Sequence, residues 1–79
     1  MNARLNWRDD AVIELVPGYT LTAADGAQAE RLTGVRLAVE GGFVHVAVPG
    51  ADDIQAVSAP AVRRLVYPRP TPADDRLDD

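Results

Sequence analysis

The stretch that decides the fold is residues 34–48, with the sequence GVRLAVEGGFVHVAV. Apolar residues alternate there on both sides of Gly41 and Gly42, and alternation with a period of two is typical of a half-buried β-strand. Two consecutive glycines accept the positive φ angles that a two-residue hairpin turn requires. The segment therefore predicts a tight β-hairpin.

A two-residue turn fixes the register of this hairpin, because Glu40 must then face Phe43 and the remaining pairs follow outward. One face carries only apolar pairs, and we expect it to be the core face. These pairs are Val39/Val44, Leu37/Val46 and Val35/Val48. The opposite face carries Glu40/Phe43, Ala38/His45 and Arg36/Ala47.

Shorter strands are predicted on both sides of the hairpin. Residues 11–16 are rich in β-branched side chains and end at Pro17-Gly18, which places Ile13 and Leu15 on one face. Residues 54–57 and 62–67 form two more strands, separated by the break at 59–61. In the last strand Leu65 and Tyr67 are expected to share a face with Arg63, and Val62, Arg64 and Val66 to share the other.

Residues 19–33 allow two interpretations. Alternation from Tyr19 to Ala23, followed by Asp25-Gly26, indicates a second hairpin. Thr22 could instead cap a short helix that continues to Leu32, although Gly26 inside it would cost about 1 kcal/mol relative to alanine. The hairpin, or an irregular excursion, is the favoured interpretation.

The chain is thus predicted to be all-β: an N-terminal arm at 1–10, a domain at 11–67, and a proline-rich acidic tail at 68–79 that is disordered. Five to six short strands indicate a small barrel or sandwich. The order of strand, excursion, tight hairpin, short strand and kink resembles the topology of SH3-like or Sm-like small barrels. That resemblance implies a helical turn before the last strand and implies no functional residue.

Composition argues against an enzyme. The 79 residues contain no cysteine, no lysine and a single histidine, His45. Ser58 is the one serine, and neither it nor His45 stands in a glycine-rich segment that would build a nucleophile site. Adjacent carboxylates such as Asp52-Asp53 point apart in a strand and are typical of turns. We expect no catalysis, no cofactor, no metal site and no small-molecule substrate.

Charge and hydropathy argue against a nucleic-acid-binding, a membrane-spanning or a secreted protein. The net charge is −4, and the last six residues, with four aspartates and Arg76, account for −3 of it. A nearly neutral body gives no broad attraction to nucleic acid. No apolar run approaches the ~18 residues of a membrane span, and the first ten residues lack the apolar region of a signal peptide. We expect a cytoplasmic protein, or a component of a virion assembled in the cytoplasm.

The leading hypothesis is a non-enzymatic protein–protein interaction or structural module. It would be an oligomeric subunit or an adaptor of a larger assembly such as a phage particle. The mixed face of the central hairpin is the candidate interface, with Phe43 as its buried anchor, unless the protein's own strands cover that face. The alternative is a small nucleic-acid-binding barrel that uses an arginine pair near Tyr67. Trp7 is either a core plug or an anchor in a partner. The candidate binding residues are Trp7, Arg36, Phe43, His45, Arg63 and Arg64.

Overall fold

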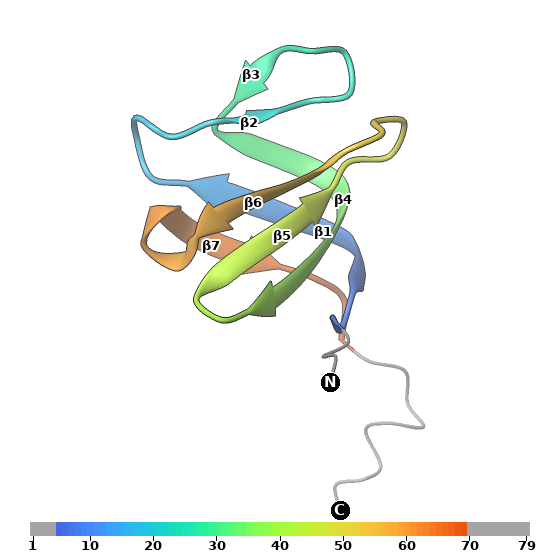
Figure 1. Ribbon diagram of the computed structural model, residues 1–79, viewed down its shortest axis with the longest axis vertical. Helices are drawn as coiled ribbons and strands as arrows, with labels where there is room; N and C mark the ends of the chain where they lie inside the picture. The colour runs from blue at the N-terminus through green and yellow to red at the C-terminus, as the bar shows by residue number, and fades with distance from the viewer. Residues whose placement is uncertain (1–4, 70–79) are drawn as a thin grey trace, which may run out of the picture.

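A computed structural model describes residues 5–69, and these residues form strands joined by turns and one short 3-10 helix (Figure 1). The prediction of an all-β chain is confirmed, and so is the helical turn before the last strand. Part of the predicted arm and most of the predicted tail lie outside the described residues. The elements are β1 (Arg8–Leu15), β2 (Leu21–Thr22), β3 (Gln28–Ala29), β4 (Arg31–Glu40), β5 (Phe43–Ala47), β6 (Ile54–Ser58), η1 (Ala59–Ala61) and β7 (Val62–Val66).

Five strands make one antiparallel sheet in the order β6-β5-β4-β1-β7, and β2 pairs with β3 in a separate two-stranded sheet. The large sheet curls around the core, and the β2–β3 hairpin lies at the end remote from the start of β1 (Figure 1). No ladder joins β6 to β7 in the described part of the chain, so hydrogen bonds do not close the sheet. Both of these strands are therefore edges.

The central hairpin has the predicted register, with Glu40 opposite Phe43 and Leu37 opposite Val46. Gly41 and Gly42 have φ angles of 62° and 83°, which side chains other than glycine rarely adopt. Five of the six residues predicted for the core face are buried. They are Val35, Leu37, Val44, Val46 and Val48.

Two residues of this hairpin depart from the prediction. Val39 was expected in the core and is 57% exposed, because the ladder of β1 on β4 stops at Leu37 and no strand among residues 5–69 covers the end of the hairpin. Ala38 belongs to the opposite face and is nonetheless buried. Its methyl group faces His45 across the ladder, and longer side chains flank it along β4.

Three register shifts explain where the strand predictions fail. β1 begins at Arg8 and not at residue 11, because a bulge around Asp10 (φ 53°) breaks the alternation that defines a strand in sequence. A second shift lies near Gly34, which has φ 65°. The third lies at Arg63 in β7, where Arg63 and Arg64 are both exposed. Val62 and Leu65 both pack against the core, so the prediction that puts them on opposite faces is wrong, whereas Arg64 and Val66 are both exposed.

Residues 19–33 contain the β2–β3 hairpin, which confirms the favoured interpretation, and the helical alternative is wrong. Leu21 pairs with Ala29, and the Asp25 carboxylate accepts a 2.9 Å hydrogen bond from the Ala27 amide in the turn. The Gln55 side chain ties this hairpin to β6. It accepts from the Thr22 amide and donates to the Thr22 carbonyl oxygen, both at 2.8 Å.

The core is aliphatic and contains no buried polar or charged residue among those described. Its side chains come from the three inner strands of the large sheet, β1, β4 and β5, together with Leu21 of β2 and Val48, which follows β5. Edge residues such as Val57 and Leu65 pack against its margin. The central cluster is Ala11, Ile13, Leu15, Leu21, Leu32, Val35, Leu37, Val44, Val46 and Val48.

Val46→Ala is expected to lower the free energy of unfolding by at least about 1.5 kcal/mol, because two buried methyl groups are lost at ~0.8 kcal/mol each and a cavity remains. Val39→Ala makes the same chemical change at an exposed position of the same hairpin face and is expected to change stability by less than about 0.5 kcal/mol. Urea denaturation of both variants measures the difference. Equal costs would contradict the burial assigned to this face.

Candidate interaction surface

The outer surface of β5 and β6 contains no Asp, Glu, Lys or Arg side chain. Its three cross-strand pairs are Phe43/Ser58, His45/Ala56 and Ala47/Ile54, and we call these six residues the neutral face. Ile54 is 57% exposed and Phe43 is 47% exposed, whereas His45 and Ala47 are half-buried. A contiguous uncharged surface with two large exposed apolar side chains is typical of a contact site.

The main chain of β6 presents a regular free edge. The Ala59 amide donates a 2.8 Å hydrogen bond to the Gly42 carbonyl oxygen, which makes Phe43/Ser58 a non-hydrogen-bonded pair of the ladder. Pairs alternate along an antiparallel ladder, so the N–H and C=O groups of alternate β6 residues point away from β5. The residues with outward main-chain groups are Ile54, Ala56 and Ser58.

The other edge, β7, is different. A register shift at Arg63 disrupts its spacing, and the exposed side chains of Arg63 and Arg64 stand on it. Bulges and charged side chains are the devices by which proteins prevent an edge strand from pairing with another chain. β6 has neither a bulge nor a charged residue. The two edges are therefore chemically unequal.

Trp7 and Arg36 meet on the outer surface next to the start of β1. The Arg36 guanidinium lies 5.4 Å from the centroid of the Trp7 ring, and Arg36 Nε donates to Asp9 Oδ1 at 2.7 Å. Trp7 is half-buried and does not belong to the core cluster, so it is not a core plug. The bulge at Asp9-Asp10 separates this corner from the regular part of β1.

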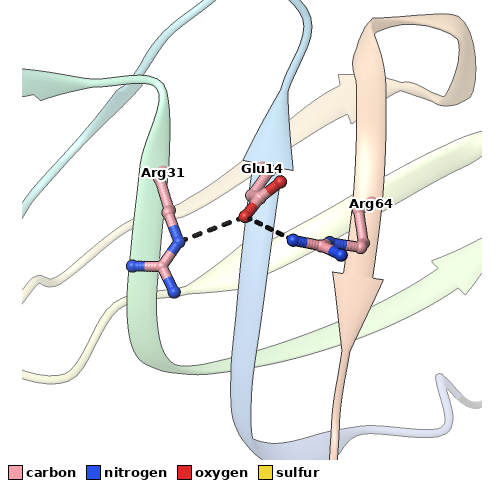
Figure 2. A network of polar contacts seen from close by, with 3 residues as sticks. All are labelled: Glu14, Arg31 and Arg64. Atoms are coloured by element: carbon pink, nitrogen blue, oxygen red, sulfur yellow. Dashed lines mark hydrogen bonds and ion pairs between the residues drawn. The ribbon is translucent and has the colours of Figure 1, made fainter.

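Glu14 lies between two arginines from the strands on either side of β1 (Figure 2). Arg31 Nε and Arg64 Nη2 each lie 3.2 Å from the same oxygen, Glu14 Oε2. The hydrogen bond from Arg64 is the main cause that lowers the pKa of Glu14, with a smaller contribution from Arg31, and partial desolvation opposes the shift. These two ion pairs link β4, β1 and β7 through Glu14.

The structure divides the predicted site residues into three groups. Phe43 and His45 lie on the neutral face, and Arg36 is adjacent to it because it pairs with Ala47. Trp7 contacts Arg36 from the other side. Arg63 and Arg64 stand on β7, which β4 and β1 separate from β5.

Sequence reasoning missed the contribution of β6 to this surface. Its signal was present in the strand sequence IQAVS, which lacks any charge, whereas the last strand contains two arginines. Nothing in a single sequence, however, shows which predicted strand occupies the edge of a sheet.

The hollows of the molecule are shallow and differ in their charge. One of about 250 Å³ is lined by the ionisable side chains of Glu14, Glu30, Arg31 and Arg63. One of about 500 Å³ lies between the β2–β3 turn and β4, and Arg31 is its one charged lining residue. Another, of about 150 Å³, is lined by Asn6, Arg8, Leu37, Val39 and Tyr67 at the end of the hairpin, where the Arg8 guanidinium lies 5.2 Å from the Tyr67 ring centroid.

Within residues 5–69, no three side chains of the metal-binding types gather at one point. None of the described segments forms a helix with the length and hydropathy needed to cross a bilayer. Comparison with protein-family models, with curated proteins and with solved structures finds no match. The geometry of the surface is thus the basis for any functional proposal.

Glu14→Gln is expected to reduce the loss in free energy of unfolding that occurs when the pH is lowered from neutral into the acid range. A carboxylate whose pKa is lowered by folding stabilises the protein at pH values above its unfolded pKa, and this contribution is lost as pH falls through the folded pKa. The variant lacks this contribution at neutral pH and so has less to lose on acidification. Urea denaturation at pH 7 and at several values below 5 measures the effect.

Glu40→Gln is the matched control, because it removes a carboxylate that forms no ion pair with the described residues. A loss of stability between neutral and acid pH that is the same in wild type and in Glu14→Gln would contradict the assigned role of the Arg31–Glu14–Arg64 contacts.

Proposed function

We propose that this protein is a non-enzymatic interaction module, a subunit or adaptor of a larger protein assembly, and that it binds its partner through the neutral face and the free edge of β6. The observation that carries the proposal is a regular, uncharged strand edge beside two exposed apolar side chains, Phe43 and Ile54. Proteins normally protect such an edge, and an unprotected one is a template for pairing with another strand.

The distribution of aromatic residues supports this proposal. All four aromatic side chains lie outside the aliphatic core cluster. Tyr19, Phe43 and Tyr67 are 52%, 47% and 42% exposed, and Trp7 is half-buried. Aromatic side chains are enriched in protein interfaces, where they supply much of the contact energy. Here they are retained at the surface, where a partner can reach them.

The fold is also compatible with the proposal. The strand order β6-β5-β4-β1-β7, with η1 between β6 and β7, is the order that an SH3-like or Sm-like small barrel would have. Such a scaffold offers rigid surfaces and short loops, but the analogy is one of fold and assigns no partner. The arm at 1–10 and the tail at 68–79 are further docking segments in this proposal. Its setting is the cytoplasm or a virion such as a phage particle.

A nucleic-acid-binding barrel is the second candidate, and one feature favours it. Arg63 and Arg64 lie on the same strand that leads to Tyr67, whose ring is stacked under Arg8. Two features weigh against it. Glu14 neutralises part of the charge of Arg64, and the chain carries a net charge of −4. A mobility shift that falls steeply with salt and is lost in Arg63→Ala/Arg64→Ala would favour this candidate.

Phe43→Asp is expected to abolish binding to the native assembly, because it places a charge in the centre of an apolar contact. Val39→Asp is the matched control, since Val39 is an exposed apolar residue of the same hairpin, at 57% against 47% for Phe43, and lies off the neutral face. Each tagged variant is incubated with extract of the native source, and the bound proteins are identified by mass spectrometry. A partner that is retained by Phe43→Asp, or lost equally with both variants, would contradict the proposed surface.

A further inference from the structure

We infer that the partner at the β6 edge is a second copy of this chain, with the two β6 strands paired antiparallel about a twofold axis at Ala56. The inference rests on the proposed function and names the partner of the same surface. It follows from the outward main-chain groups, from the apolar side chains beside them, and from the placement of charge.

The main-chain groups of β6 are self-complementary in this arrangement. With Ala56 opposite the partner's Ala56, Ile54 comes opposite the partner's Ser58, and Ser58 opposite the partner's Ile54. These are the three residues whose N–H and C=O groups point away from β5. Every outward donor therefore meets an outward acceptor, and the two large sheets become one continuous sheet.

The exposed apolar side chains also meet. Within one chain, Ser58 lies beside Phe43 on the neutral face. In the dimer, Ile54 would lie next to the partner's Ser58, with the partner's Phe43 immediately beyond. Strands are about 4.8 Å apart, so Ile54 and the partner's Phe43 would be about 10 Å apart at their β-carbons, across a small serine side chain. Side chains of this size reach across such a gap, and the twofold axis repeats the contact.

Charge placement favours this pairing over the alternatives. Asp52 and Asp53 precede β6, and an antiparallel register sends the two acidic pairs to opposite ends of the interface. A twofold pairing through β7 would instead bring Arg63 and Arg64 of both copies together. A head-to-tail pairing of β6 with β7 would match a regular ladder to one that a register shift interrupts. Closed twofold dimers are also the commonest symmetric oligomers.

Cysteine cross-linking tests the axis directly, because the chain contains no cysteine. In Ala56→Cys the two introduced thiols would come from a directly opposed pair with a Cα separation of about 5.5 Å, which lies within disulfide range. Under a glutathione redox buffer the full-length variant is expected to form a covalent dimer. Val39→Cys and Val66→Cys, which are similarly exposed but off the β6 edge, are expected to remain largely monomeric.

Ala56→Pro gives an independent test without a covalent bond. The Ala56 N–H points away from β5, so proline there removes no hydrogen bond of the folded chain but removes two from the dimer. Dimer affinity measured by sedimentation is expected to fall by at least about tenfold. Gln55→Pro is the contrasting variant, since the Gln55 N–H pairs with β5 and its loss is expected to lower the thermal midpoint.

Two results would overturn the inference. One is Ala56→Cys that cross-links no faster than Val39→Cys. The other is wild-type protein that sediments as a monomer at millimolar concentration, or as a ring or filament larger than a dimer. If either occurs while Phe43→Asp still loses a partner that Val39→Asp retains, the proposed function stands and a different protein occupies β6. If that contrast also fails, both proposals fail.

Discussion

The pairing of β4 with β5 is the constraint on which the rest of the structure depends. Gly41 and Gly42 both have positive φ, and this two-residue turn permits one register between the strands. A shift by one residue would turn Leu37 and Val46 from the core to the surface. The same register extends to β6, because each β5 residue pairs with one residue of β4 and one of β6. The turn therefore determines which side chains of β4 and β5 face the core, and the ladder between β5 and β6 continues the same alternation of faces.

The register shifts convert this sheet into a curled one and make its two edges unequal. Bulges bend a strand and increase its twist, and they occur here in β1, β4 and β7 but in neither β5 nor β6. Curling allows one five-stranded sheet to enclose its own aliphatic core. The edge that carries a bulge and two arginines is protected, whereas the edge that continues the regular hairpin is not. The bulges are thus confined to β1, β4 and β7, and the β6 edge keeps a regular ladder.

The sequence was informative where a local rule decides the structure. The hairpin was predictable in register because turn, alternation and β propensity all agree between Val35 and Val48. The start of β1 was not predictable, because the bulge at Asp9-Asp10 interrupts the alternation of apolar and polar residues by which a strand is identified in sequence. Val39 was misassigned because its exposure depends on where β1 stops, which is a property of the assembled sheet. The sequence analysis named Phe43, His45 and Arg36 as candidates for the surface proposed here. It did not name Ile54 and Ala56, because the position of a strand at an edge is a tertiary property.

The size of the chain connects its stability to its surface. A domain of about this length buries only about 60% of the surface that its unfolded chain exposes, and this one has no cysteine with which to form a disulfide. Its core is built from alanine, valine, leucine and isoleucine, while every aromatic residue, each able to bury 150–250 Å² in general, lies outside that cluster. The aromatic side chains, which have the largest apolar surfaces in the sequence, therefore remain partly exposed in a single chain. Association through Phe43 and Ile54 would bury part of it, and since binding to the folded state stabilises that state, assembly and stability would be thermodynamically linked.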